Sequence, residues 1–192
     1  MLSRRTLLSA LALSAAAWGL SAHAAGQTLV PAQSEVTFVA KQLGVPLQGR
    51  FKRFQAQVAF DPKALPTSKI AFELDLGSVA LNADADAELP KAEWFNVPKS
   101  PKATFQSTAI QALGGGKFQV RGKLAIKGQA RDLVVPVTLT QAKGLSTASG
   151  AFTLKRLDYR VGEGDWTDTS IVANEVQVQF KLVLQEIGRA HV

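Results

Sequence analysis

The sequence predicts an all-β domain of about eight antiparallel strands, closed into a barrel or folded as a sandwich, with one short helical insertion. Three observations lead to this prediction. Apolar and polar side chains alternate with a period of two in several segments, as in strands with one dry and one wet face. Turn residues separate these segments at hairpin spacing. One acidic segment lacks the alternation.

Eight segments carry strand chemistry. Their ranges are 34–41, 51–60, 69–76, 102–112, 117–127, 131–140, 148–156 and 175–184. The alternation is clearest in 69–76, 117–127 and 175–184, where every second residue is apolar and is predicted to face the interior. The basic residues of 117–127 are placed on the outward face; they are Lys117, Arg121, Lys123 and Lys127. Turn signals separate the strands at Asp61-Pro62, Gly114-Gly115-Gly116, Lys127-Gly128 and Lys143-Gly144.

The exception is residues 83–96, ADADAELPKAEWFN. This segment begins with acids and contains Pro90, which indicates a short, broken helix or two helical turns. Asp84, Asp86 and Glu88 are interpreted as the solvated start of this helix, because carboxylates are favoured at the positive end of the helix dipole.

The first 24 residues have the pattern of an export signal. Arg4-Arg5 are basic, residues 7–20 are apolar, and Ala22-His23-Ala24 resembles a cleavage site. Both the general and the twin-arginine export routes fit this pattern. We therefore expect a periplasmic protein.

A single folded domain is expected over residues 25–185. Residues 186–192, EIGRAHV, are expected to be a non-native tail, because a nucleotide string that encodes them resembles a sequencing adapter. An ordinary frayed terminus is the alternative.

The composition argues against several kinds of function. The two histidines, His23 and His191, lie in the two end segments, and there is no cysteine. We therefore expect no histidine base, zinc site, thiol nucleophile or disulfide, no metal, no cofactor and no enzymatic activity. The net charge of +7 falls to +5 without residues 1–24, and the basic residues are scattered. We expect no nucleic-acid binding, while loose contact with an anionic membrane remains open.

Five segments resemble, in order, the signature segments of the YceI-like, polyisoprenoid-binding family. They are GRFKRFQAQVAFDP (49–62), SKIAFELDLGSVAL (68–81), WFNVPKSPKATFQST (94–108), GKLAIKGQARDLVVPVTL (122–139) and EVQVQFKLVL (175–184). The resemblance covers about residues 27–185 and implies an extended, eight-stranded, antiparallel lipocalin-like barrel. Its apolar tunnel would hold a long isoprenoid lipid, such as a quinone or a polyprenol, and the protein would be a periplasmic carrier of that lipid.

The resemblance and the strand parity together give the expected ligand-binding residues. They are Phe38, Phe72, Leu74, Trp94, Phe95, Phe105, Phe118, Val120, Leu124, Ile126, Val135, Val137, Val178, Phe180 and Leu182. Trp94 and Phe95 lead back from the helix into a strand. They would cap or line the tunnel, or else only attach the helix to the end of the barrel. Gly122 is expected to leave a gap.

The chain departs from the family pattern at three places. Gln33-Ser34 and Ala87-Glu88-Leu89 stand where the family often has histidines, and Arg160 stands where glycine is usual. The resemblance therefore implies the apolar lining but no particular contacts with a lipid head group. With these departures, the chain is similar to YceI-like domains found beside membrane-bound b-type cytochromes.

Two alternatives to a lipid carrier stay open at this point. One is a packed barrel without a lipid, which docks on a membrane protein such as a b-type cytochrome. The other is an enzyme that acts on an isoprenoid, and this would require Asp158, Tyr159 and Arg160 to face the tunnel. Neither the lipid's identity nor the oligomeric state follows from the sequence.

Overall fold

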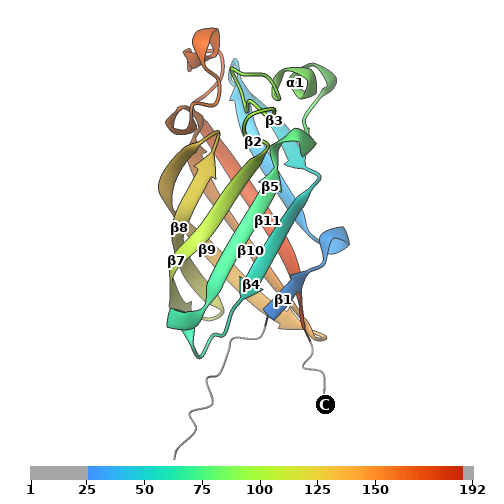
Figure 1. The fold of residues 1–192 in the computed structure, drawn as a ribbon, viewed down its shortest axis with the longest axis vertical. Helices are drawn as coiled ribbons and strands as arrows, with labels where there is room; N and C mark the ends of the chain where they lie inside the picture. The colour runs from blue at the N-terminus through green and yellow to red at the C-terminus, as the bar shows by residue number, and fades with distance from the viewer. Residues whose placement is uncertain (1–25, 188–192) are drawn as a thin grey trace, which may run out of the picture.

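The computed structural model describes residues 26–187 as an antiparallel β-structure with one short α-helix (Figure 1). The strands are β1 (Gly26–Leu29), β2 (Glu35–Gln42), β3 (Val45–Phe51), β4 (Phe54–Ala59), β5 (Lys69–Asp75), β6 (Val79–Ala80), β7 (Lys102–Gly114), β8 (Lys117–Ile126), β9 (Gln129–Ala142), β10 (Leu145–Lys155) and β11 (Glu175–Glu186). The helix α1 is Ala83–Glu88. Short 3-10 helices include η1 (Pro31–Gln33), η4 (Arg156–Tyr159) and η5 (Gly164–Thr167).

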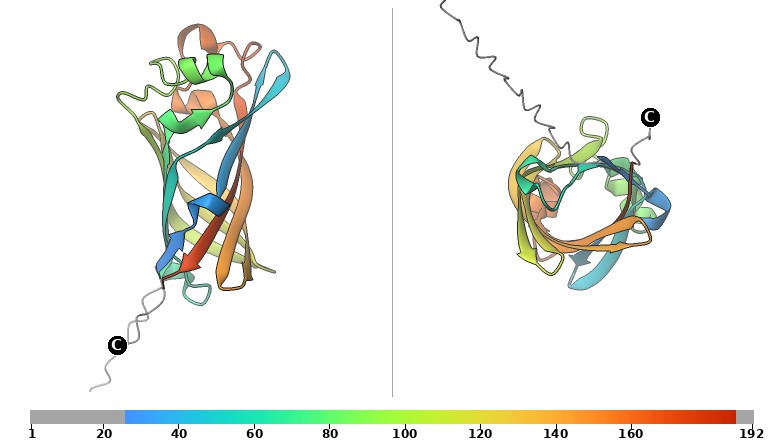
Figure 2. Two further views of the ribbon diagram at one scale, coloured as in Figure 1. Left: turned by 90° about the vertical axis from the view of Figure 1, so that its right-hand side faces the viewer. Right: turned by 90° about the horizontal axis from the view of Figure 1, so that it is seen from below.

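Eight of these strands close into a barrel, which confirms the predicted fold class. The order around the ring is β1-β4-β5-β7-β8-β9-β10-β11, and β1 pairs with β11 to close it. The closing pairs include Gln27 with Glu186 and Leu29 with Leu184. Farther along β11, the neighbour changes from β1 to β2, and the hairpin of β2 and β3 extends the wall beyond the ring. Figure 2 shows this hairpin and α1 at the same end of the barrel.

The strand prediction for 51–60 is wrong at its start, because this range joins the end of β3 to β4. The chain bends at Lys52 and Arg53, whose N–H groups donate to the carbonyl and the hydroxyl of Ser78, respectively. The strands β1, β3 and β6 were not predicted from the sequence. β1 and β6 are short, and β3 contains Pro46 and Gly49, which are more typical of turns.

The predicted broken helix at 83–96 is confirmed in outline. Asn82 caps α1 by accepting a hydrogen bond from the Ala85 N–H at 2.9 Å, and the Asp86 carboxylate accepts one from the Leu81 N–H at 2.7 Å. After Glu88 the chain continues in tight turns up to β7. No helix within residues 26–187 is long and apolar enough to cross a membrane.

The described chain continues slightly beyond the expected domain boundary at residue 185. β11 includes Glu186, and the Ile187 N–H donates to the Gly26 carbonyl at 3.0 Å, so both residues belong to the edge of the barrel. The predicted export signal and the rest of the predicted tail lie outside the described residues.

Candidate functional site

An apolar cavity of about 550 Å³ runs through the barrel, within the usual range for small-molecule sites. One end is lined by Phe60, Leu139 and Leu184, and the other by residues of β2 and α1. Inward side chains such as Phe72 and Val178 keep part of their surface accessible, as expected for a hollow interior.

All fifteen residues predicted to bind ligand line this cavity. They are Phe38, Phe72, Leu74, Trp94, Phe95, Phe105, Phe118, Val120, Leu124, Ile126, Val135, Val137, Val178, Phe180 and Leu182. The alternation of the strands therefore places every strand residue of this set on the face that the sequence predicted. Val178, for example, pairs with Phe38 on β2 and with Phe152 on β10, and directly paired residues share a face of the sheet. That these residues contact a ligand stays a prediction.

Three phenylalanine rings rest against inward glycines on neighbouring strands. A methyl group added to Gly49 would overlap the ring of Phe38. The same relation joins Gly150 to Phe180 and Gly122 to Phe105. The prediction that Gly122 leaves a gap is therefore wrong, because the Phe105 ring occupies that space. These three glycines allow large rings to lie close to the wall and leave the centre of the barrel open.

The opening of the cavity lies between β2 and α1. The lining residues with exposed side chains are Lys41, Gln42, Asn82 and Asp84, all at this end. The wall between the two ends is almost entirely aliphatic and aromatic. This lining suits an apolar ligand with any polar group near the opening.

Trp94 and Phe95 both line the cavity and close part of its end. Trp94 is 8% exposed, and its ring centre lies 5.2 Å from that of Trp166. Phe95 lies 6.2 Å from Phe51. The pair thus both lines the cavity and packs the segment after α1 against neighbouring aromatic rings; a role in capping a tunnel stays a prediction. Trp94 Nε1–H is buried and has no hydrogen-bond partner among the described residues.

Arg156 is the main feature of the site whose role was not predicted from the sequence. Its side chain is buried at 2% exposure and lines the cavity end, 5.8 Å from the centre of the Trp94 ring. All five guanidinium N–H groups donate to main-chain carbonyls. The acceptors are Val161, Gly162, Trp166, Val172 and Ala173. Burial lowers the pKa of Arg156 from its ordinary value.

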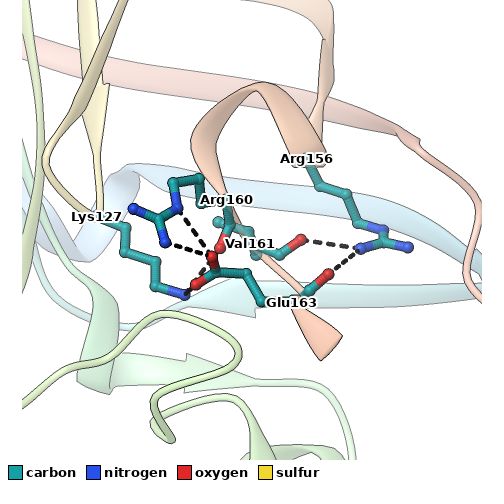
Figure 3. Close-up of polar contacts among 6 residues, drawn as sticks. Lys127, Arg156, Arg160, Val161 and Glu163 are labelled. Atoms are coloured by element: carbon teal, nitrogen blue, oxygen red, sulfur yellow. Dashed lines mark hydrogen bonds and ion pairs between the residues drawn. The ribbon is translucent and has the colours of Figure 1, made fainter. Parts of the chain in front are cut away.

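This network, which we call the arginine cap (residues 156–173), fixes the loop between β10 and β11. Figure 3 shows the part of it that joins Arg156 to Val161. Gly162 has φ of +85°, and a methyl group there would overlap Nη1 of Arg156. Arg160, which stands where the resemblance implies a glycine, has φ of +55°. This left-handed backbone is one that glycine adopts without strain.

An ion-pair cluster connects the arginine cap to the β8–β9 turn (Figure 3). Lys127 Nζ donates to Glu163 Oε2 at 2.7 Å and to the Arg160 carbonyl at 2.8 Å, and Arg160 Nε donates to Glu163 Oε1 at 2.8 Å. Hydrogen bonds from Lys127 and then Arg160 lower the pKa of the Glu163 carboxyl. The outward assignment of Lys127 is therefore wrong, since this side chain is only 8% exposed.

The three residues proposed for acid–base chemistry do not meet in the cavity. Tyr159 lines it, and burial, followed by the nearby Asp158 charge, raises the pKa of the tyrosine. Asp158 and Arg160 are exposed instead. Within residues 26–187, no three histidine, cysteine, aspartate or glutamate side chains group closely enough to hold a metal ion.

A signal for Arg156 exists in the sequence. Phe152, Leu154 and Arg156 share one parity at the end of β10, and all three line the cavity. A basic residue at an inward position requires buried acceptors. The sequence does not indicate that five carbonyls from 161–173 supply them.

The profile of the YceI-like domain family matches residues 27–184 of this chain. Among sequence relatives, a UPF0312 protein of Azotobacter vinelandii is 32% identical over 133 residues, which cover 67% of this chain and 69% of that protein. A UPF0312 protein of Vibrio cholerae is 29% identical over 106 residues, 54% of this chain and 56% of the relative.

Two solved structures show the same architecture. BcnA of Burkholderia cenocepacia is 42% identical, with a TM-score of 0.78 over 81% of this chain and 98% of that one. A polyisoprenoid binding domain from Saccharophagus degradans has a TM-score of 0.67 at 17% identity, over 85% of this chain and 99% of that one. The second likeness concerns the fold alone.

Proposed function

Because this chain belongs to the YceI-like family, we propose that it is a binding and carrier protein for a long-chain isoprenoid lipid, such as a quinone or a polyprenol. The lipid is held in the barrel cavity, and the protein works in the periplasm after export. The observation that carries this proposal is the cavity itself, which is apolar along the wall and has its exposed polar residues at one end. The polyisoprenoid binding domain of Saccharophagus degradans, which shares the fold, supports this ligand class.

The energetics of apolar burial suit such a ligand. Burial contributes about 0.8 kcal/mol per CH₂ group, so each five-carbon isoprene unit contributes roughly 3–4 kcal/mol before costs. A few units therefore exceed the cost of ordering a flexible chain without any charged contact. The length of the cavity would then select the length of the lipid.

The two alternatives have less support. A packed barrel that acts only by docking would fill its interior with side chains, whereas this barrel contains a cavity of about 550 Å³. An enzyme that acts on an isoprenoid would need acid–base groups at the cavity, and only Tyr159 of the proposed cluster lines it.

The direct test is to identify what the protein carries. The full chain would be expressed in its own host or a related bacterium, recovered from the periplasmic fraction without detergent, and extracted with organic solvent for mass spectrometry. We expect one prenyl lipid in near-stoichiometric amount. Recovery of phospholipid alone, or of no lipid together with no uptake of added prenyl quinone, would contradict the proposal. Retention of the chain in the cytoplasm would contradict the location.

A further inference from the structure

Three hairpin turns in this protein have the same backbone but different chemistry. Leu43-Gly44, Lys127-Gly128 and Lys143-Gly144 all have positive φ at both residues, with 49°, 49° and 50° at the first and 79°, 74° and 77° at the second. Such turns favour asparagine, aspartate or glycine at the first position, because other side chains are strained there. A lysine side chain in such a turn is at least polar and compatible with exposure to water. Leu43 is apolar, and it is nevertheless 72% exposed.

The chain around Leu43 adds to this apolar tip and holds it in place. Val45 is 58% exposed and Pro46 is also exposed. The Leu43 N–H donates to the Ile171 carbonyl at 2.8 Å, and Gln42 forms a β-bridge with Val172. Residues 43–46, which we call the apolar tip, are therefore fixed against the arginine cap.

The apolar tip lies directly beside the opening of the cavity. Lys41 and Gln42, which immediately precede it, line the opening, as does Leu47 just after it. Leu81 and Asn82 line the opposite side. In Figure 2 the β2–β3 hairpin projects beyond the barrel at this end, next to α1. A surface that contacted the tip would therefore also face the opening.

The charge distribution does not favour contact between the open end of the barrel and an anionic lipid surface. Residues 41–47, 81–100 and 156–174, which surround the opening, contain eight acidic and five basic residues in total. The rest of residues 26–187 contains seven acidic and fourteen basic residues. Anionic lipids would attract the walls of the barrel and repel the open end. Contact at the open end must therefore be apolar.

We propose that the apolar tip inserts into the surface of a lipid bilayer and brings the cavity opening onto it, so that the apolar ligand enters without crossing water. This inference rests on the proposed function. A bilayer fits better than a protein partner for two reasons. Two exposed apolar side chains are far fewer than a stable protein interface needs, and a bilayer surface accepts an apolar side chain without shape complementarity.

Because the backbone at Leu43 is strained, the apolar side chain can be removed there without destabilising the fold. Leu43→Asn replaces the leucine with a residue that suits the left-handed backbone, so the fold should be kept or stabilised while the apolar contact is lost. Lys143→Asn makes the same change of turn chemistry in the β9–β10 hairpin. Uptake of a long-chain prenyl quinone from phosphatidylcholine vesicles would be followed over time. We expect uptake by Leu43→Asn to be about tenfold slower than by the parent, with the same final amount bound, and unchanged uptake by Lys143→Asn.

The same proteins separate the two proposals. If the parent fails to bind prenyl quinone even when a cyclodextrin carrier delivers it, the proposed function is wrong. If the parent binds it but Leu43→Asn takes it up from vesicles at the parental rate, the function stands and the inference about the apolar tip is wrong.

A second measurement needs no prenyl lipid. Because the chain has no cysteine, Val45→Cys can be labelled at a single site with a polarity-sensitive dye, with Lys143→Cys as the matched control. With phosphatidylcholine vesicles, we expect a blue shift of emission only for the label at position 45. The inference is overturned if this shift is absent, or if it needs anionic lipid and vanishes with salt.

Discussion

The barrel interior and the arginine cap are built on opposite principles, although they adjoin each other. The interior is lined by apolar side chains that leave a cavity of about 550 Å³. The cap is packed around one charged side chain whose five N–H groups all have carbonyl partners. Apolar contacts are non-directional, and the cavity leaves room for a larger inward side chain, so the interior should accept added side-chain volume at low cost. Hydrogen bonds to a buried cation are directional, so few other side chains should be able to replace Arg156 in the cap without a loss of stability.

The largest expected effect comes from removing the cation of the cap. Arg156→Met should lower the free energy of unfolding by about 3 kcal/mol or more, because five buried carbonyls lose their donors at once. Arg156→Lys should rescue little of this loss, since an ammonium has three donors and lacks the planar fork. Urea unfolding would measure both.

Arg121→Met on the exposed face of β8 is the control, and it should change stability by less than about 0.5 kcal/mol. If Arg156→Met and Arg121→Met were equally mild, the cap would not depend on its cation, and the contrast with the interior would disappear.

A smaller effect is expected from crowding the cap. Gly162→Ala forces a methyl group against the Arg156 guanidinium at a positive φ, and it should cost about 1–3 kcal/mol. The matched control is Gly128→Ala, where φ is also positive but no atom lies within 4 Å of the added methyl group. The difference between the two unfolding free energies isolates the clash. Equal losses would mean that only backbone strain matters at Gly162.

The interior should respond in the opposite way to crowding. Val178→Trp adds a large side chain that points into the cavity. It should leave the stability of the lipid-free protein within about 0.5 kcal/mol of the parent or raise it, whereas overpacking a filled core costs about 1–3 kcal/mol. Prenyl-lipid binding should fall at least tenfold, because the indole takes the ligand's place. Binding and lipid-free unfolding would be measured on the same samples.

Gln177→Trp serves as the control for this experiment, since its side chain is exposed on the other face of β11. It should change neither quantity. A clear loss of stability in Val178→Trp, in a parent that binds no lipid, would instead favour a packed barrel.

The smallest effect concerns pH and the ion pairs that connect the cap to the barrel. Hydrogen bonds from Lys127 and Arg160 hold the pKa of Glu163 below its ordinary value of 4.5. The folded state therefore gains stability from this carboxylate above about pH 4.5 and loses it as the pH falls through the lowered pKa. In unfolding curves between about pH 7 and 3, Glu163→Gln should lose less stability on acidification than the parent. Glu175→Gln, at an exposed carboxylate, should behave like the parent.

The residues that the sequence placed correctly are those whose position follows from alternation. Phe118, Val120 and Leu124 lie on one face because the side-chain period of a strand is two, and this period is visible without any tertiary structure. The helix start at Asp84 was predictable for a similar reason, since its signals are local.

The features that the sequence did not predict depend on segments that meet only in the folded chain. The acceptors of Arg156 come from residues 161–173, which have no regular pattern. Gly122 was predicted to leave a gap because the ring that covers it, that of Phe105, belongs to another strand. Lys127 has outward parity but lies in a turn, from which it reaches Glu163.

The glycine–phenylalanine pairs have a further consequence for the heat of binding. The rings of Phe38, Phe105 and Phe180 already rest on Gly49, Gly122 and Gly150, so an incoming apolar chain does not have to push them aside. The walls are preformed, and they offer water few hydrogen-bond partners. Apolar ligands that enter such pockets often bind with a favourable enthalpy at about 25 °C and a negative change in heat capacity. In this barrel, contact between the lipid and the stationary rings would therefore release heat, and warming would increase the heat released.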